Sequence, residues 1–426
     1  MDIEQSIREL EEKCKAARAA SRRMAYLSTD VKNRALENIA GDLLSKKDEI
    51  LAANEVDLKE GKNAGLSGSF YDRLKLSPAI LEGMAKDVLA VAALPDPVGE
   101  VFDMRTLPSG LLIGKKRVPL GVIGTIYESR PNVTTDISSL CLKSGNAVIL
   151  RGGREALHSN GTITRIVKEA ATRAGIPEGA VQFIDNTDHA LVNRMLRMNQ
   201  YIDLIVPRGG TPLITFVRDN SSIPVVAGGI GLNHTYVDKA ADIKKATQII
   251  YNAKVQKPSV CNSLNGVLVH KDVAASYLPA IAAELNKAGV ELRCDERSYA
   301  LLKGNKALKL RPVAPEDWSY EFLALIATVK VVDSIDEALA HIERYGVGHS
   351  ECIITEDYSA AMRFLAEVDA ACVFVNASTR FNDGGQFGLG TEVGISTQKM
   401  HARGPMGLRE ITSYKWIIFG TGQVRP

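Results

Sequence analysis

The chain has 426 residues, of which 45% are hydrophobic and 24% charged, and its formal net charge is +2. This is the composition of an ordinary globular protein with two or three domains, and the small net charge gives no reason to expect a nucleic-acid partner. The charged N-terminus does not resemble a secretory signal, and no apolar run is long enough to span a bilayer, so we expect no membrane partner and a cytoplasmic location.

The first hundred residues are predicted to form amphipathic helices. Ser28 is expected to cap a helix that runs through Leu44, and Pro78 to begin another that ends near Ala93. Between them, Lys59–Ser69 contains three glycines and predicts a loop.

Alternating apolar and polar residues come next. Val101–Thr106 and Leu111–Val118, joined by a Pro-Ser-Gly turn, predict a β-hairpin, and the C-terminal run Ile411–Phe419 alternates in the same way. We expect these strands to stand outside the main domains and to pair, either within one subunit or across a dimer. An ordinary edge strand is an equally weighted alternative.

From residue 120 onwards, short continuous apolar runs alternate with helical stretches, and the pattern begins again after Asn265. This pattern predicts two α/β domains with parallel sheets covered on both faces, which bind ligands at the carboxyl ends of their strands. The first sheet is predicted to contain Gly121–Tyr127, Ala147–Leu150, Val181–Ile184, Leu204–Val206 and Pro224–Ala227. The second is predicted to contain Gly266–Val269, Ala327–Val332, Cys352–Thr355 and Cys372–Asn376.

The segment 252–262 carries the most reactive group that the sequence suggests. A helix that ends near Lys254 runs into a proline–serine bend, and Cys261 lies just past that bend. A thiol there can be both exposed and firmly aimed, and Lys254 and Lys257 add positive charge that favours the nucleophilic thiolate. On this segment alone, a cysteine that only fills space is the commoner case.

The other cysteines and the histidines give no sign of a metal site. The six cysteines include no CxxC pair, and the histidines form no HExxH motif. We therefore expect neither a disulfide framework nor a bound metal, and we expect a reducing compartment.

Two strand ends of the first domain carry groups that suit a phosphate. Gly209, Gly210 and Thr211 lie between a strand and a helix, where backbone N–H groups and the helix dipole favour an anion; a plain turn is equally probable on this evidence. Arg151 and Arg154 follow another strand, and their positive charge would favour a dinucleotide with a 2′-phosphate. Solvated surface arginines are the commoner explanation of a single pair.

A further polar residue, Asn132, follows the strand that begins at Gly121. Its amide N–H could be donated to a developing oxyanion. An asparagine beside a proline is more often only a turn former.

In combination, these motifs resemble the aldehyde dehydrogenase superfamily and, within it, the gamma-glutamyl phosphate reductase family, over nearly the whole chain. The segments that carry the resemblance are 118–124, 128–132, 145–154, 258–262, 341–351, 376–381 and 401–405. The resemblance implies an aldehyde dehydrogenase-like α/β fold with two Rossmann-like parallel-sheet domains and a small β-hairpin oligomerisation element. It implies an NADP-binding domain (1–100 and 119–240), a catalytic domain (241–400) and oligomerisation strands (101–118 and 405–426).

The resemblance also assigns roles to individual residues. It implies that Cys261 is the nucleophile and that Asn132 stabilises the oxyanion. For NADP(H), it implies contacts from Arg151, Arg154, Gly209, Gly210, Thr211 and Glu321. For the substrate, it implies anchors among Ser378, Thr379, Arg380, His401 and Arg403.

The implied reaction is the NADPH-dependent reduction of L-glutamyl 5-phosphate to L-glutamate 5-semialdehyde and phosphate, through a cysteine thioester, in proline biosynthesis. Residues 226–231 lack the carboxylate with which hydrolytic relatives activate water, so a thioester would survive to meet phosphate. The resemblance favours a homo-oligomer and makes glutamate 5-kinase a candidate partner. Two alternatives stay open: an acylating dehydrogenase that uses coenzyme A, and a non-catalytic scaffold with the same fold.

Overall fold

The computed structural model describes residues 3–66 and 68–425, except for the side chains of 68–70. The chain divides into two compact units. Unit 1 comprises residues 1–228, 388–394 and 405–426, and unit 2 comprises residues 229–387 and 395–404. Among the described residues, no helix is both long and apolar enough to cross a membrane.

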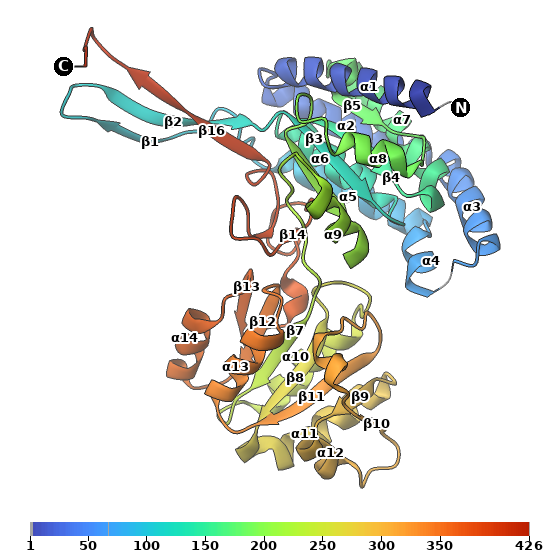
Figure 1. Ribbon diagram of the computed structural model, residues 1–426, viewed down its shortest axis with the longest axis vertical. Helices are drawn as coiled ribbons and strands as arrows, with labels where there is room; N and C mark the ends of the chain where they lie inside the picture. The colour runs from blue at the N-terminus through green and yellow to red at the C-terminus, as the bar shows by residue number, and fades with distance from the viewer. Residues whose placement is uncertain (1–2, 67, 426) are drawn as a thin grey trace. The chain divides into compact units, whose positions relative to one another are not determined.

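Unit 1 contains a four-stranded parallel sheet with the order β5-β4-β3-β6 (Figure 1). Its strands form because most of their residues are apolar, and every residue of β3 and β4 is buried. The order is that of one half of a nucleotide-binding sheet, whose ligand lies where the order reverses, here between β3 and β6. The strands are β3 (Val122–Tyr127), β4 (Ala147–Gly152), β5 (Val181–Phe183) and β6 (Leu204–Arg208).

Helices account for most of the rest of unit 1. Ser28 caps α2 through its side chain and Pro78 begins α5, both as predicted, and the Ser77 side chain caps α5. The helices are α1 (Ile3–Met24), α2 (Thr29–Ser45), α3 (Lys47–Asn63), α4 (Gly68–Leu74), α5 (Pro78–Ala93), α6 (Asn132–Lys143), α7 (Leu157–Arg173), α8 (His189–Met195) and α9 (Thr211–Asn220), with 3-10 turns η1 (Arg154–Ala156) and η2 (Glu178–Ala180).

Three antiparallel strands of unit 1 form a separate ribbon (Figure 1). They are β1 (Val101–Thr106), β2 (Leu112–Pro119) and β16 (Thr412–Phe419), with β2 in the centre. The predicted hairpin is therefore present, and the C-terminal strand pairs with it within one chain, Lys415 opposite Lys116. Its role in oligomerisation stays a prediction.

Unit 2 contains a seven-stranded parallel sheet with the order β10-β9-β11-β8-β7-β12-β13. The strands are β7 (Asn233–Val237), β8 (Leu264–His270), β9 (Glu291–Cys294), β10 (Lys309–Pro312), β11 (Ile326–Val332), β12 (Ser350–Ile354) and β13 (Cys372–Val375). The helices are α10 (Ile243–Val255), α11 (Lys271–Lys287), α12 (Glu296–Leu302), α13 (Ile335–Tyr345) and α14 (Tyr358–Glu367), with 3-10 turns η3 (Pro315–Ser319) and η4 (Thr379–Phe381).

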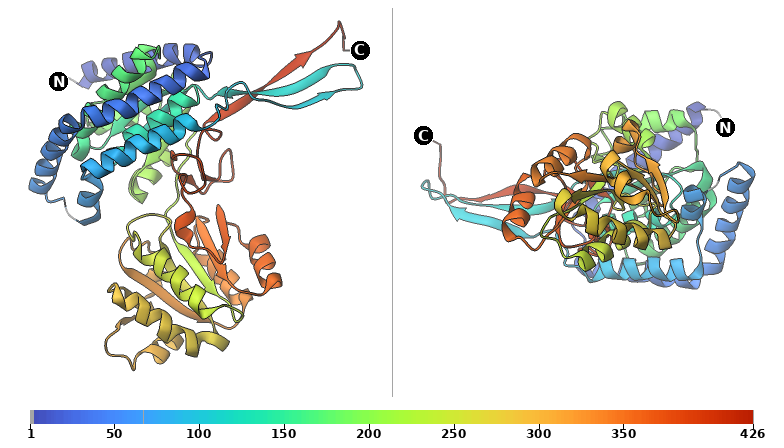
Figure 2. Two further views of the ribbon diagram at one scale, coloured as in Figure 1. Left: turned by 180° about the vertical axis from the view of Figure 1, so that it is seen from behind. Right: turned by 90° about the horizontal axis from the view of Figure 1, so that it is seen from below.

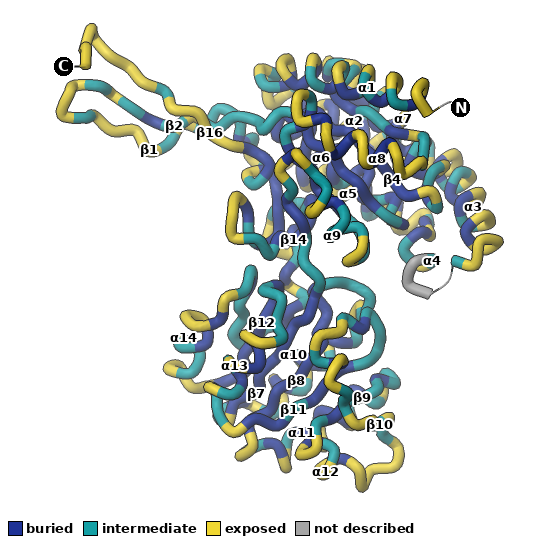
Figure 3. The backbone as a smooth tube through the Cα atoms, viewed as in Figure 1, coloured by how far each residue is buried: buried dark blue, intermediate teal, exposed yellow. Residues whose placement is uncertain are grey.

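Successive residues of the central strands belong to two separate hydrophobic cores, one on each face of this sheet. Val267 and Val269 pack among residues of α10 and α11, whereas Leu268 packs among residues of α13 and α14. Both faces are therefore covered (Figure 2), and the central strands are buried along their length (Figure 3). The prediction of two α/β domains with parallel sheets is confirmed.

Three predicted boundaries are wrong. Residues 229–240 were assigned to the first domain, but β7 lies between β8 and β12 in the sheet of unit 2. Residues 388–394 were assigned to the second domain and belong to unit 1. The loop expected from Lys59 begins only after Asn63, because α3 continues through Gly61, which packs against Leu66.

A further strand prediction is wrong in its extent. The run Pro224–Ala227 makes only an isolated bridge, Val225 opposite Ile205. The short strands β9 and β10 were not predicted; β10 lies at the edge of the sheet and β9 lies next to it.

Candidate active site

Cys261 differs from the other five cysteines in its exposure. All six lie in the described part of the chain; Cys261 is half-buried and the others are buried. Burial raises the pKa of the Cys14 and Cys352 thiols to about 12 and that of Cys294 to about 11, which disfavours their thiolates. Cys261 is therefore the thiol best placed to act as a nucleophile.

The backbone around Cys261 is fixed from several sides. The side-chain amide of Asn233, in β7, donates to the Cys261 and Ser263 carbonyls, both at 2.7 Å. The Thr379 hydroxyl donates to the Asn262 carbonyl at 2.8 Å, and the Asn262 amide donates to the Asn382 carbonyl at 2.9 Å. These contacts hold the loop between α10 and β8 in one conformation, so the neighbouring residues fix the position of the Cys261 thiol.

Glu321 reaches the same loop through Gly231. Its Oε1 atom accepts a hydrogen bond from the Gly231 N–H at 2.8 Å. Gly231 in turn lies against Cys261, because a Cβ atom built on it would stand 1.6 Å from the Cys261 carbonyl oxygen. No side chain can occupy position 231, and the structure brings the predicted cofactor ligand Glu321 to the neighbourhood of the predicted nucleophile.

Lys254 corrects one expectation. It was expected to add positive charge near the thiol, but it is fully buried and its Nζ atom donates to the Leu264 carbonyl at 2.7 Å. Burial lowers the pKa of Lys254 to about 7, against the opposite effect of Glu321. Lys254 thus ties the end of α10 to the start of β8, and it carries only part of a charge near neutral pH.

The glycine turn of unit 1 also differs from expectation. Its N–H groups were predicted to be open to a phosphate, but the Gly210 N–H donates to Oε2 of Glu128 at 2.8 Å. Glu128 follows β3 and Gly210 follows β6, so the two meet where the strand order reverses. Glu128 was not among the predicted site residues, although its position directly after a buried strand was a usable signal.

The two predicted arginines of unit 1 lie in different surroundings. Arg151 was predicted to follow the strand but is the fifth residue of β4, and it is buried, which removes the alternative of a solvated surface arginine; its Nη2 atom donates to the Thr187 carbonyl at 2.8 Å. Within the described structure its Nε atom has no hydrogen-bond partner, and burial lowers its pKa. Arg154, in η1, is exposed.

Asn132 is the first residue of α6, and its Nδ2 atom donates to the Asp136 carboxyl at 2.9 Å. Burial, followed by the nearby Asp87, raises the pKa of Asp136 to about 7. The predicted oxyanion donor is thus held by Asp136, which was not among the predicted site residues.

The predicted substrate anchors do not form one cluster. Ser378 and Thr379 are buried, and their hydroxyls hold the backbone of η4 and of Asn262. Arg380 lies over the nucleophile loop, in contact with Asn262. Arg403 instead binds Asp369 at 2.7 Å, and His401 is exposed.

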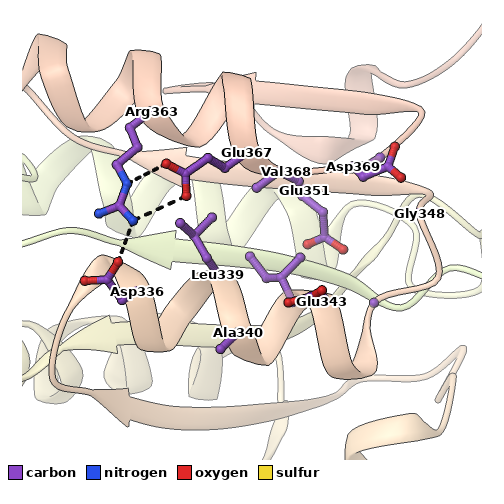
Figure 4. A pocket seen from close by; sticks show the side chains of 13 residues that line it. Asp336, Leu339, Ala340, Glu343, Gly348, Glu351, Arg363, Glu367, Val368 and Asp369 are labelled. Atoms are coloured by element: carbon purple, nitrogen blue, oxygen red, sulfur yellow. Dashed lines mark hydrogen bonds and ion pairs between the residues drawn. The ribbon is translucent and has the colours of Figure 1, made fainter.

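A cavity of about 470 Å³ in unit 2 lies elsewhere, between α13 and α14 (Figure 4). At one end, Arg363 is held by Asp336 and Glu367. At its base the buried Glu351 binds the backbone and ring of His234 at 2.8 and 3.1 Å. None of the predicted site residues lines this cavity, so it is separate from the Cys261 site.

The residues of unit 1 fit a dinucleotide. The strand order is that of a nucleotide-binding half. The glycine turn at the start of α9 lies at the carboxyl end of β6, and the buried Arg151, whose Nε atom has no partner within the described structure, lies near the carboxyl end of β4. Gly209, Gly210 and Thr211 would hold its phosphates once Glu128 moves aside. Arg154, the exposed first residue of η1, would stand at the outer end of the dinucleotide.

The chain is similar to known proteins along almost its whole length. The aldehyde dehydrogenase family matches residues 4–298 and 317–417. Gamma-glutamyl phosphate reductases of Dehalococcoides mccartyi (strain ATCC BAA-2266) and Caldanaerobacter subterraneus subsp. tengcongensis are 60% and 55% identical to it, over 99% and 98% of this chain and 100% of each relative. The crystal structure of gamma-glutamyl phosphate reductase from Thermotoga maritima is 48% identical, with a TM-score of 0.93 over 98% of this chain and 100% of that one.

Proposed function

The chain belongs to the aldehyde dehydrogenase family and, within it, to the gamma-glutamyl phosphate reductases, and on that premise we propose that it reduces L-glutamyl 5-phosphate to L-glutamate 5-semialdehyde with NADPH, through a thioester on Cys261. The reaction is a step of proline biosynthesis. The observation that carries the proposal is the half-buried thiol of Cys261 on a loop that its neighbours hold in place.

In the first step, the Cys261 thiolate attacks the acyl carbon of the substrate, the carbon–sulfur bond forms and phosphate leaves with the electrons of the broken carbon–oxygen bond. The developing oxyanion needs hydrogen-bond donors, for which the Cys261 backbone N–H and the Asn132 amide are the proposed groups. Residues 226–231 carry no carboxylate that could activate water, so we expect slow hydrolysis of the thioester.

In the second step, the thioester carbon is reduced. The nicotinamide cofactor, when bound, supplies the hydride, and Glu321 is the residue of unit 2 proposed to orient its ribose. The resulting thiohemiacetal on Cys261 then collapses: its carbon–sulfur bond breaks, the aldehyde forms and the thiolate is regenerated.

The direct test is Cys261→Ala, assayed in the reverse direction by NADP reduction with the semialdehyde and phosphate. We expect activity to fall to background, because no other thiol can form the acyl-enzyme. Undiminished turnover in a correctly folded variant would remove Cys261 from the mechanism.

Phosphate separates this proposal from a coenzyme A-dependent acylating dehydrogenase. A phosphorylating enzyme needs phosphate to release the acyl group from the cysteine. The rate of aldehyde oxidation should therefore rise with phosphate concentration and should not depend on coenzyme A. The reverse dependence would favour the alternative.

The proposed preference for NADP over NAD depends on Arg154. Its exposed guanidinium would bind a 2′-phosphate, which NAD lacks. Arg154→Glu should shift the ratio of kcat/KM values from NADP towards NAD. An unchanged ratio would count against this assignment.

We also propose a homo-oligomer formed through the ribbon of β1, β2 and β16. Trp416, Ile418 and Phe419 of its last strand are 46%, 59% and 56% exposed, which suits burial against another chain. Ile418→Glu should lower the molar mass of the oligomer that is measured in solution. Glutamate 5-kinase stays a candidate partner.

A further inference from the structure

The side chain of Asn265 contacts the backbone on both sides of Glu321. Asn265 is the second residue of β8, four residues after Cys261, and it is buried. Its Nδ2 atom donates to the Tyr320 carbonyl at 3.1 Å, and its Oδ1 atom accepts the Phe322 N–H at 3.4 Å. The amide therefore pairs with the two residues that flank Glu321 in the way that a neighbouring strand would.

These two contacts need a donor and an acceptor on one short side chain. Asparagine has both, whereas an ionised aspartate has only acceptors and alanine has neither. Because the amide of Asn265 is buried, a shift of the neighbouring backbone would leave its donor or its acceptor without a partner, which is unfavourable. Asn265 thus resists movement of Glu321 relative to β8.

The segment 320–325 depends on such side-chain contacts. It lies between η3 and β11 and forms neither helix nor strand in the described structure. Leu323 has a φ of 50°, a conformation that a leucine keeps only where its surroundings enforce it. The Arg293 guanidinium, itself bound to Asp317, lies 4.8 Å from the centroid of the Phe322 ring. Side chains from β8 and β9 therefore fix the place of this segment.

The carboxylate of Glu321 is held separately from its backbone. Its Oε1 atom accepts the Gly231 N–H at 2.8 Å, and Gly231 lies directly against the Cys261 carbonyl. Gly231 therefore holds the carboxylate, and Asn265 holds the backbone. The position of Glu321 relative to Cys261 is thus fixed at two points within unit 2.

We propose that Asn265 is a positioning residue for the reduction of the thioester: its amide fixes Glu321, and with it the cofactor contact that Glu321 provides, at a set place relative to Cys261. The inference rests on the proposed function, in which Glu321 orients the nicotinamide ribose and Cys261 carries the acyl group. It assigns different roles to two buried asparagines of unit 2. Asn233 holds the Cys261 carbonyl and so positions the nucleophile, whereas Asn265 positions the cofactor ligand.

The first test measures the binding of NADP to the full-length protein by calorimetry, which needs no catalysis. Asn265→Ala should weaken NADP binding by about 3- to 10-fold, the range for one lost hydrogen bond between neutral groups. Asn265→Gln keeps a donor and an acceptor and should retain part of the affinity. Asn286→Ala, on the partly exposed side of α11, is the control and should bind NADP as the wild type does. An unchanged affinity in Asn265→Ala would overturn the inference.

A double variant shows whether Asn265 acts through Glu321. Asn265→Ala combined with Glu321→Gln should bind NADP no more weakly than Glu321→Gln alone, because the two residues act through one contact. Losses of affinity that add up would overturn the inference. Asn265→Ser no longer spans both backbone groups, so it takes the place of Asn265→Ala in both measurements if the alanine variant does not fold.

The second test measures how fast iodoacetamide alkylates Cys261 in the absence of the cofactor. Asn265→Ala should keep this rate within about twofold of the wild type, since it leaves the contacts of the nucleophile loop in place. Asn233→Ala removes one of those contacts and should change the rate by more than this. A parallel loss of alkylation rate and NADP affinity in Asn265→Ala would show that Asn265 supports the whole loop, and would overturn its assignment.

Failure of the inference and failure of the proposed function give different results. If Cys261→Ala retains turnover, the thioester mechanism fails, but the NADP affinities of the Asn265 variants still decide the positioning of Glu321. If Glu321→Gln binds NADP as tightly as the wild type, Glu321 is not a cofactor ligand. The inference is then overturned together with that assignment, and the role of Cys261 is unaffected.

Discussion

The carboxylate of Glu128 and the backbone N–H of Gly210 form a hydrogen bond of 2.8 Å across the carboxyl ends of β3 and β6. This N–H belongs to the turn proposed to hold the dinucleotide phosphates, so a carboxylate and a phosphate would compete for one donor. Glu128→Gln should therefore bind NADP more tightly, by at least about fivefold, since the repulsion between two like charges about 4 Å apart is worth about 1 kcal/mol even at the dielectric constant of water. Calorimetric titration measures this directly.

Glu82→Gln is the matched control for Glu128, because Glu82 lies on the exposed side of α5 and loses the same charge. It should leave NADP affinity unchanged. Weaker binding by Glu128→Gln would show that the carboxylate contacts the cofactor directly, for example a ribose hydroxyl, and does not compete with it.

Gly231→Ala should lower kcat sharply without unfolding the protein. The added Cβ would meet the Cys261 carbonyl oxygen at 1.6 Å, so the nucleophile loop must move. A displacement of about 1 Å at a reacting group costs on the order of 100-fold. Gly41→Ala, in α2 with open space around it, is the control and should slightly raise the melting temperature while leaving kcat unchanged.

A thiol reagent should modify Cys261 first and leave the other five cysteines intact in the native protein, because only Cys261 is not buried. Peptide mass mapping after limited treatment with iodoacetamide identifies the site. Loss of activity should follow the fraction of Cys261 that is modified. Early modification of Cys372 or Cys14 in place of Cys261 would contradict the exposure on which the proposed mechanism depends.

The sequence predicted those parts of the fold that depend on local pattern. The strand Val122–Tyr127 is continuously apolar because helices cover both faces of its sheet, and the α5 boundaries follow from the Ser77 cap and Pro78. β10 was missed because an edge strand with exposed Lys309 and Arg311 needs no apolar pattern. Such strands are fixed by their neighbours in space, not by their own residues.

The chemistry of the site was predictable only in part, for the same reason. Cys261 stands out by its bend and its motif. The burial of Lys254, however, depends on Leu264 and on the core around it, and the contact between Glu128 and Gly210 joins residues far apart in the sequence. The position of Glu128 directly after a strand can be read from the sequence, but its partner Gly210 and the burial of Lys254 cannot, so both contacts become visible only when the strands are placed side by side.

The pKa of Asp136, raised to about 7 from its ordinary value of 3.8, makes the stability of unit 1 depend on pH. A carboxyl with a raised pKa holds its proton more tightly in the folded state than in the unfolded state. Between the two pKa values the folded state binds more protons, so its contribution to stability is present at low pH and is lost as the pH rises through about 7.

Asp136→Asn removes the titrating group, while its side-chain carbonyl can still accept the Asn132 N–H. We expect the variant to melt at least about 2 °C above the wild type near pH 9, and this advantage to shrink or vanish near pH 5. Asp87→Asn removes the neighbouring like charge, so it should lower the pKa of Asp136 and move the loss of stability to lower pH. Differential scanning calorimetry across this range measures both shifts. A difference between wild type and Asp136→Asn that stays constant with pH would show that Asp136 does not titrate there, and that its carboxylate holds Asn132 in the charged state throughout.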